Sequence, residues 1–440
     1  MKVKELSKEE FDNFAKQDDF ANPWQTSNFA LAAQALGYET LYLGIEDNGA
    51  LKGCTLLLTK NVYLGQYISY APRGIITDYG NTTLVVSILN TLKTYLSDRK
   101  IMSITMDPPI VMEVRDKHGV IKESNYNGID KALDAQLHNN EIIKKQDYAK
   151  EFRKTIMRKN KFEYRGENYY FEGILPRWYS EIKLPIVTKN LLAQVDKRTR
   201  NKLRKSAKLG VEIIKDDTMN VENFYDLAKE NFNRPAEYYK ALLENNPDAE
   251  VYLAKINTER YVNNSKILYE RELDRNESLA RIIEERNLRG KNIQKILNKK
   301  MESDHIIAGY KEHLVVATNL LKTNPEGLFI AYAIVMKSNK HVYIFEDGYA
   351  KQYKNIPAIN LLRFKLLDQY SSENRYETFN FGAITGNFDR KNNDLYGLNV
   401  ARLSLNGTVV EYIGEFGIMT NKAMYNLYQA AVIDRFNFKI

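Results

Sequence analysis

A dense run of cations in the middle of the chain is the first feature able to bind a charged ligand. From Asp196 to Val211 the sequence reads Asp-Lys-Arg-Thr-Arg-Asn-Lys-Leu-Arg-Lys-Ser-Ala-Lys-Leu-Gly-Val. On a helix, Lys197, Arg200 and Arg204 fall near one face, apart from the apolar positions. Cations held on a rigid helix suit a pyrophosphate or a nucleic-acid backbone. A solvated basic face without a ligand is the alternative, and the pattern alone does not choose between them.

A second feature is an arginine between proline and glycine at the end of an expected strand. The segment reads Tyr70-Ala-Pro-Arg-Gly-Ile-Ile-Thr-Asp-Tyr79. Arg73 is well placed there to hold a carboxylate or a phosphate. An ion pair between Arg73 and Asp78 that pins the loop explains the same residues equally well.

Two glycine-bearing loops near the C-terminus form a third feature. Asn380-Phe-Gly-Ala-Ile-Thr-Gly-Asn-Phe388 contains Gly382 and Gly386, and a second such stretch runs over residues 395–407. Glycines at strand ends let backbone N–H groups approach a ligand closely. As a motif this pattern is weak.

Several familiar sites are missing from the sequence. There is no Walker loop, G-x-G-x-x-G, nucleophile elbow or H-E-x-x-H motif, and the acetyltransferase pyrophosphate loop R/Q-x-x-G-x-G/A is absent. Cys54 is the single cysteine and lies in an apolar run that is typical of a buried strand. We therefore expect neither a metal site nor a cofactor.

The elements that must position these residues repeat once along the chain. In the first half we expect strands over 39–46, 52–59 and 66–70, a helix over 83–97 and a strand over 101–106, with Asp47-Asn48-Gly49 as a hairpin turn. In the second half the same order appears as strands over 250–255, 327–336 and 341–346, a helix over 358–370 and a strand over 378–382. This order indicates an internal structural duplication.

The second copy is interrupted between its first two strands. Residues 256–321 contain no proline, their only glycines are Gly290 and Gly309, and apolar positions recur with helical spacing. Arg289-Gly290 is the natural turn between two antiparallel helices. A loop of this length without structure of its own would be unusual, so we predict a helical hairpin.

Composition limits the setting and the partners. The formal net charge of +8 fits a phosphate-bearing partner such as tRNA, although a basic protein with no such partner is equally compatible. The N-terminus has no apolar signal region, and no stretch approaches the length needed to cross a bilayer. We expect a cytoplasmic protein with at most peripheral contact with the inner face of a membrane.

Taken together, the order of motifs resembles the Fem family of tRNA-dependent peptidoglycan bridge aminoacyltransferases. The resemblance covers nearly the whole chain and rests on stretches in the family's order. These stretches are Trp24 to Tyr38, Tyr70 to Tyr79, Ile104 to Pro108, Leu175-Pro-Arg177, the basic helix, Phe379 to Ala383 and Tyr412-Ile-Gly-Glu-Phe416.

The resemblance implies an α/β (α+β) fold of tandem acetyltransferase-like (GNAT-like) domains with an antiparallel coiled-coil arm inserted in the second. The first domain would span 1–150 and be completed by 395–440. The second would span 151–255 and 322–394, with 256–321 as the arm. Two positions depart from the family: Ala33-Gln34 stands where a phosphate-binding lysine is frequent, and Ala401-Arg402 stands where the family has Phe-Lys.

The resemblance also implies the reaction. An amino acid would pass from aminoacyl-tRNA to the stem-peptide amine of lipid II or a UDP-MurNAc-peptide, and other Fem-type proteins are possible partners. We expect Arg402 to stabilise the oxyanion, with backbone N–H groups near Gly382 and Gly386. The residues expected to bind the acceptor are Tyr70, Arg73, Lys202 and Arg204, and those expected to contact tRNA are Lys197, Arg198, Arg200 and Lys205. Asp107 and Asp389 are weak candidates for a base.

Two other functions remain open at this point. The chain could use another acyl donor such as acetyl-CoA, against which the missing pyrophosphate loop argues. It could also be a non-catalytic binding protein of the same fold, which the altered Phe-Lys position would favour.

Overall fold

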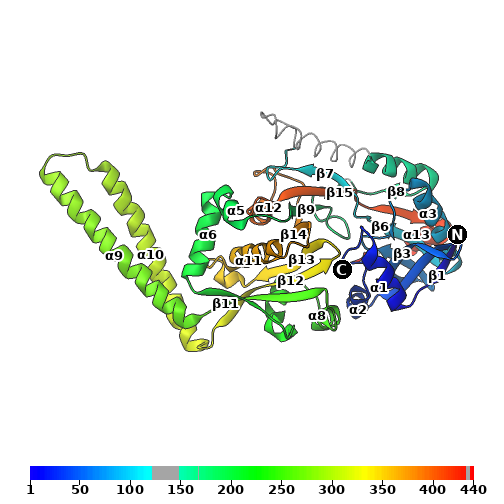
Figure 1. Cartoon of the computed structure of the whole chain (residues 1–440), viewed down its shortest axis with the longest axis horizontal. Coiled ribbons are helices and arrows are strands. Elements are labelled where there is room, and N and C mark those ends of the chain that lie inside the picture. Colours follow the sequence, from blue (N-terminus) through cyan, green and yellow to red (C-terminus); the bar gives the residue numbers. More distant parts are fainter. Residues whose placement is uncertain (121–147, 167, 433–436) are drawn as a thin grey trace.

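The computed structural model describes residues 1–120, 148–166, 168–432 and 437–440. The described chain forms two α/β lobes side by side, and a long helical hairpin projects from the second (Figure 1). The part of the predicted first domain that covers residues 121–147 lies outside the described residues.

The first lobe is built on one mixed sheet with the strand order β1-β2-β3-β4-β6-β16-β8, and β5 pairs with β3. Its strands are β1 (Lys2–Glu5), β2 (Glu39–Asp47), β3 (Ala50–Tyr63), β4 (Gln66–Ala71), β5 (Ile76–Thr77), β6 (Ile101–Met106), β8 (Glu163–Tyr164) and β16 (Phe416–Met419). Its helices are α1 (Lys8–Gln17), α2 (Ser27–Ala35), α3 (Thr82–Asp98) and α13 (Lys422–Ala431). The turn between β2 and β3 holds Asn48 and Gly49 at φ of 48° and 80°, as the Asp-Asn-Gly signal predicts.

The second lobe has the sheet order β10-β11-β12-β13-β14-β9-β15-β7. Its strands are β7 (Val111–Arg115), β9 (Trp178–Lys183), β10 (Val211–Lys215), β11 (Ala249–Ile256), β12 (Leu328–Ser338), β13 (His341–Tyr349), β14 (Thr378–Ile384) and β15 (Thr408–Tyr412). Its helices are α5 (Thr188–Gln194), α6 (Lys197–Lys208), α7 (Tyr225–Asn231), α8 (Ala236–Leu243), α11 (Ala358–Ser372) and α12 (Tyr396–Leu403).

The predicted duplication is present in the sheet registers. In each lobe three successive strands pair antiparallel, and a helix then leads to a fourth strand that pairs parallel with the third. These parallel pairs are β4 with β6 and β13 with β14. The predicted domain boundaries differ from the observed sheets, because segments on both sides of the predicted boundaries contribute strands to both sheets. β7 and β15 pair with each other in the second sheet, whereas β8 and β16 pair in the first. Residues 395–440 are therefore divided between the lobes, and only their last part completes the first sheet.

The inserted arm consists of α9 (Thr258–Leu288) and α10 (Gln294–Thr323), 31 and 30 residues long. They pack against each other along the projection seen in Figure 1, and the chain turns at Arg289 and Gly290, where Gly290 has a φ of +62°. The predicted hairpin and its turn are both confirmed.

One apolar core contains residues of both lobes. Trp24, just before α2, and Phe29, in its first turn, pack their rings against Phe345 of β13 at centroid distances of 5.6 and 6.3 Å. Asn28 donates a hydrogen bond to the Glu244 carbonyl, 2.9 Å away, and α2 packs along α8. This contact holds the facing surfaces of the two lobes in a fixed relation.

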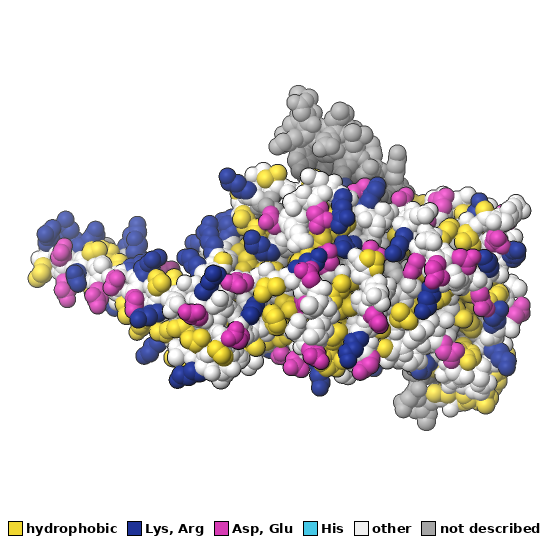
Figure 2. Space-filling view, turned by 60° about the horizontal axis from the view of Figure 1, so that its bottom comes forward, with side chains coloured by type: hydrophobic (Ala, Val, Ile, Leu, Met, Phe, Trp, Pro, Cys, Tyr) yellow, Lys and Arg dark blue, Asp and Glu magenta, His cyan; other side chains and the backbone are white. Residues whose placement is uncertain are grey.

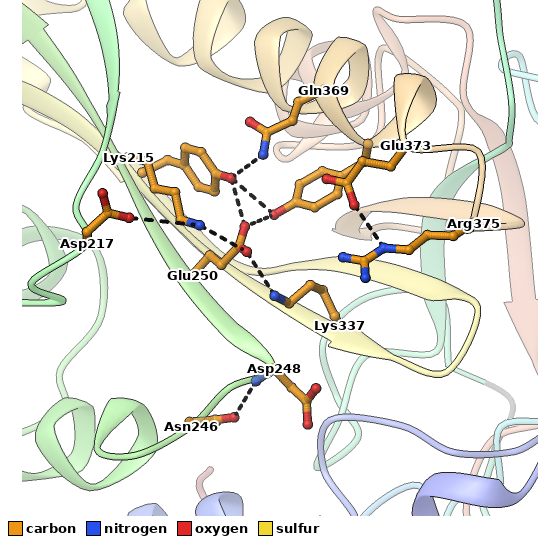
Figure 3. A network of polar contacts seen from close by, with 11 residues as sticks. Lys215, Asp217, Asn246, Asp248, Glu250, Lys337, Gln369, Glu373 and Arg375 are labelled. Atoms are coloured by element: carbon orange, nitrogen blue, oxygen red, sulfur yellow. Dashed lines mark hydrogen bonds and ion pairs between the residues drawn. The ribbon is translucent and has the colours of Figure 1, made fainter.

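Glu250 of β11 is the centre of a polar network that ties the second sheet to α11 (Figure 3). Its carboxylate forms ion pairs with Lys337 of β12 at 2.8 Å and Lys215 of β10 at 3.2 Å. It also accepts a hydrogen bond from the Tyr370 hydroxyl of α11 at 2.5 Å. Burial alone would raise the pKa of Glu250, but Lys337 and the tyrosine hydroxyls outweigh it and lower that pKa to about 2.

We expect Glu250→Gln to lower the free energy of unfolding by about 1–3 kcal/mol at pH 7, because the charged hydrogen bonds are lost. The lowered pKa means that this stabilisation is complete above about pH 4.5 and disappears as the pH falls towards 2. Urea unfolding of wild type and variant at pH 7 and pH 3 measures the effect. Glu373→Gln, in the peripheral Arg375 pair of the same view, is the control and should change little. An equal difference between wild type and Glu250→Gln at both pH values would contradict the role assigned to Glu250.

Candidate active site

A cavity of about 280 Å³ opens between the two lobes. Its walls come from the start of α2, the segment that leads into β9, and strands β13 and β14. Its lining includes Trp24, Phe29, Gly173, Ile174, Tyr179, Arg234, Tyr238, Tyr343, Glu346, Asn380, Gly382, Arg402 and Ile440. Aromatic walls with a few polar groups are typical of a site for a small ligand or a reacting end of a large one.

One end of this cavity lies where two parallel strands separate. β13 and β14 pair only between His341–Tyr343 and Thr378–Asn380, and beyond that point they no longer pair with each other. The Arg402 guanidinium, which comes from α12, bridges the opening. It contacts Asp347 Oδ1 of β13 at 2.8 Å and donates to the Phe381 carbonyl of β14. The predicted catalytic arginine is thus 11% exposed and lines the interlobe cavity.

Asp347 holds two arginines at once. Its Oδ2 lies 2.7 Å from Nε of Arg363 on α11, and its Oδ1 pairs with Arg402. Burial alone would raise the pKa of Asp347, but the two guanidinium groups outweigh it and lower the pKa. Burial lowers the pKa of Arg402 and Asp347 opposes that effect. This part of the site therefore carries a net positive charge.

The two predicted loop glycines have structural partners for their N–H groups. Gly382 N donates to Asn380 Oδ1 at 2.8 Å, and Gly386 N donates to the Tyr169 carbonyl at 2.6 Å. Neither N–H group is free in this arrangement. The glycine at 382 is needed for another reason: its φ is +96°, and a Cβ there would overlap Arg402.

Gly382→Ala is accordingly expected to displace the Arg402 guanidinium and to destabilise the second lobe, because both the left-handed backbone and the contact disfavour a side chain. We expect a loss of at least about 1 kcal/mol of stability, together with a loss of activity. Thermal unfolding and a rate assay of the variant would measure this. Gly397→Ala, on α12 with open space around it, is the matched control. Wild-type stability in Gly382→Ala would contradict the steric argument.

Arg73 is buried and is not placed to hold a ligand, contrary to the role that its position between proline and glycine suggested. Its side chain is 2% exposed and pairs with Asp107 at 3.0 Å, rather than with Asp78. It also donates to Tyr179 Oη at 3.1 Å and to the Pro176 carbonyl of the second lobe. Tyr70, the other expected acceptor contact in this segment, is fully buried. Arg73 joins the two lobes, and neither side chain is open to a ligand in this arrangement.

Arg234 is a functional candidate that sequence reasoning missed. It precedes α8, is 20% exposed and lines the interlobe cavity, where it forms an ion pair with the buried Glu346. The hydroxyls of Tyr239 and Tyr332 also donate to that carboxylate, at 2.9 and 2.6 Å. A lone Arg-Pro pair before a helix carries no signal for this role in the sequence.

A second cavity of about 480 Å³ lies in the first lobe and shares the lining residues Gly173 and Ile174 with the first one. Its polar lining includes Arg165, Glu172 and Glu415. Burial, with the negative charge of Asp107 adding to it, raises the pKa of Glu415 to about 7. This carboxylate can therefore accept a proton near neutral pH, which the sequence pattern around it did not reveal. The earlier base candidates fit less well, since Asp107 is paired with Arg73 and Asp389 caps an exposed turn.

The basic helix α6 lies next to the arm (Figure 1), and none of its residues lines the interlobe cavity. Arg204 and Lys205 line a separate cavity of about 450 Å³ between α6 and the arm helices. Lys197 and Arg198 are exposed, whereas Arg200 donates to three carbonyls at the end of α5. Burial, helped by Arg198, lowers the pKa of the half-buried Lys202. Lys and Arg side chains gather along the arm and on the body beside it (Figure 2).

The described residues contain neither a metal-binding cluster nor a membrane-spanning helix. No group of His, Cys, Asp and Glu side chains there has a metal-binding arrangement. No helix among them is both long and apolar enough to cross a bilayer.

Comparison with known proteins assigns the chain to a family. The profile of the FemAB family matches residues 6–432. The chain belongs to the FemAB family. A lipid II:glycine glycyltransferase of Staphylococcus epidermidis is 23% identical over 439 residues, covering 98% of this chain and 95% of the relative. The aminoacyltransferase FemB of the same species is 23% identical over 451 residues, covering all of both chains.

The FemAB fold is also found among solved structures. A crystal structure of FemX superposes with a TM-score of 0.65 at 20% identity, over 97% of this chain and 99% of that one. The predicted architecture, two similar α/β halves with a helical arm inserted in the second, is confirmed. With relatives named as glycyltransferase and aminoacyltransferase, this FemAB protein is an enzyme of the acyltransferase class.

Proposed function

We propose that this enzyme transfers an aminoacyl group from aminoacyl-tRNA to the side-chain amine of a peptidoglycan stem peptide, carried by lipid II or a UDP-MurNAc-peptide. The product would be one residue of an interpeptide bridge. The relatives named as lipid II:glycine glycyltransferase and FemB support this acceptor.

Two neighbouring cavities with complementary chemistry, which share two lining residues, carry the proposal. The first-lobe cavity holds Glu415, whose pKa of about 7 suits a proton acceptor. The interlobe cavity holds Arg402, a cation at the opening between β13 and β14. Gly173 and Ile174 line both, and the Ile174 N–H donates to the Glu415 carboxylate. An amine and an acyl ester brought in from the two sides would meet at this segment.

The reaction itself makes modest demands, because an aminoacyl ester is already activated. The acceptor nitrogen attacks the ester carbonyl carbon, and Glu415 takes the proton that the nitrogen loses. The bond to the tRNA ribose oxygen then breaks, and this oxygen receives the proton. The positive charge of Arg402 stabilises the carbonyl oxygen while it is negative. Holding the two substrates together supplies much of the remaining acceleration.

The acceptor and the tRNA would approach on different surfaces. Arg165 is the cation in the lining of the first-lobe cavity, and it is available to the acceptor's phosphate groups. The exposed cations of α6, including Lys197 and Arg198, and the pocket with Arg204 and Lys205 suit the tRNA backbone. Lys202 lies on the same helix and is the remaining candidate for a phosphate contact.

Muropeptide composition tests the function in the cell. Deleting the gene should remove one bridge residue from the stem peptides, as read by mass spectrometry of digested cell walls. Wild-type protein should restore that residue, and Arg402→Ala should not. Muropeptides of unchanged mass after deletion would reject the proposed acceptor.

A further inference from the structure

Asn380 of β14 carries a buried N–H₂ group that has no hydrogen-bond partner among the residues that the structure describes. The side chain is 1% exposed. Its Oδ1 accepts the Gly382 N–H at 2.8 Å, and because a backbone N–H can only donate, this contact fixes which end of the amide is which. The Nδ2 atom is therefore the free end.

The position of Asn380 on the strand directs it towards the interlobe cavity. Its neighbours Phe379 and Phe381 pack into the core of the second lobe, and alternate residues of a strand lie on opposite faces. Asn380 pairs with Tyr343 of β13, which lines the cavity and contacts Trp24 across it at a centroid distance of 5.9 Å. Asn380 itself is part of the cavity lining.

Arg402 adds a second unsatisfied group beside it. Its Nη1 donates to the carbonyl of Phe381, the residue that follows Asn380, and its Nη2 is held by Asp347. The Nε of Arg402 is buried and lacks a partner within the described chain. Two buried nitrogen groups that lack acceptors in the described chain therefore belong to residues that line the same cavity.

Such groups are costly unless a ligand uses them. Most buried polar groups in folded proteins are hydrogen-bonded, and a buried N–H left without an acceptor costs about 1–3 kcal/mol. An amide N–H₂ beside a guanidinium, both fixed by contacts on their other sides, is complementary to a single oxygen that becomes negative. Fixed N–H groups of this kind stabilise a tetrahedral intermediate without reorganising during the reaction.

We propose that Asn380 Nδ2, together with Arg402 Nε, binds the carbonyl oxygen of the acyl donor and stabilises it as the oxyanion. This assignment rests on the proposed function and adds a catalytic residue to it. Attack by the acceptor nitrogen moves the carbonyl electron pair onto that oxygen. The pair returns to the carbon when the ribose oxygen departs, and the proton passes from the acceptor nitrogen to the ribose oxygen.

Two substitutions separate this role from a structural one. Asn380→Asp keeps the oxygen that accepts the Gly382 N–H and removes the N–H₂ group, while Asn380→Ala removes both. The matched control is Asn387→Asp, in the loop after β14 and outside the cavity lining. Each protein is assayed with glycyl-tRNA and lipid II, and with other charged tRNAs if glycine is not the substrate, and its melting temperature is measured.

We expect both Asn380 variants to lower kcat by about 100-fold or more, as removal of one oxyanion-binding group does. KM for both substrates should stay within about threefold, Asn380→Asp should melt near the wild type, and Asn387→Asp should keep its rate. If wild type transfers and either Asn380 variant retains kcat within threefold, or the loss appears in KM, Asn380 does not have this role and the proposed function still stands. If wild type transfers no amino acid from any charged tRNA, the proposed function fails and this assignment with it.

Discussion

Arg402→Ala is expected to lower the turnover number by about 100- to 1,000-fold, with a much smaller effect on KM. The guanidinium lines the interlobe cavity at the opening between β13 and β14, where it is held by Asp347 and the Phe381 carbonyl. A charge fixed in a water-poor cavity interacts more strongly with a developing oxyanion than it would in water. Steady-state rates with varied acyl donor and acceptor give kcat and KM separately.

The fold supplies a close control for this prediction. Arg363 pairs with the same carboxylate of Asp347 and lies outside the cavity lining. Arg363→Ala should therefore destabilise the protein to a similar extent, because each variant leaves Asp347 with one arginine, while most of the turnover remains. Arg402→Lys should recover part of the lost rate, since it restores the charge without the planar geometry. Equal losses of kcat in Arg363→Ala and Arg402→Ala would indicate that Arg402 acts only through stability.

Glu415→Gln is expected to lower kcat/KM by about 100-fold at pH 8 and to change the shape of the pH profile. A base works in its deprotonated form, and burial raises the pKa of Glu415 to about 7. The wild-type rate should therefore rise as the pH increases through about 7 and level off above it. In Glu415→Gln this rise should be absent, because glutamine does not titrate.

Glu172 provides the comparison for that experiment. It is an exposed carboxylate in the lining of the same first-lobe cavity. Glu172→Gln should keep the rise in rate near pH 7 and most of the activity. A rise with the same midpoint in Glu415→Gln would assign the titration to another group, such as the acceptor amine itself.

The elements were predictable from the sequence because each follows from a local pattern. The spacing of apolar residues gave the helix at 83–97, observed as Thr82–Asp98, and the absence of proline gave the long arm. The Asp-Asn-Gly turn specified one hairpin. The repeated order of strands and helices then predicted both lobes, since a parallel strand pair joined by a helix closes in a limited number of ways.

The strand exchange and the partners of the buried arginines were not predictable in this way. β7, β15 and β16 are short strands, and the sequence of each is compatible with either an edge or a central position. Local patterns therefore do not say which sheet they join. Arg73 meets Asp107, Pro176 and Tyr179, all remote in sequence, and the nearby Asp78 was the only partner that sequence distance suggested. The pKa of Glu415 is raised because the assembled lobe buries the carboxylate and brings Asp107 near it.

The candidate site was predicted in part. Arg402 was singled out because it stands where the resembled family has the lysine of a Phe-Lys pair, and it lines the interlobe cavity. Arg204 was expected to bind the acceptor and Lys205 to contact tRNA; both line the cavity between α6 and the arm, and neither lines the interlobe cavity. Asn380 was expected only as part of the strand over 378–382 and the glycine-bearing stretch there, because nothing in a sequence shows that one end of a buried amide is left without a partner.

The most direct test of the central claim is the mass of lipid II after incubation with the purified enzyme and a mixture of charged tRNAs. If the enzyme is a tRNA-dependent aminoacyltransferase, lipid II gains the mass of one amino acid residue on its stem peptide. This gain requires the charged tRNA rather than the free amino acid. A stem peptide of unchanged mass with every charged tRNA, for both lipid II and the UDP-linked precursor, would contradict this claim.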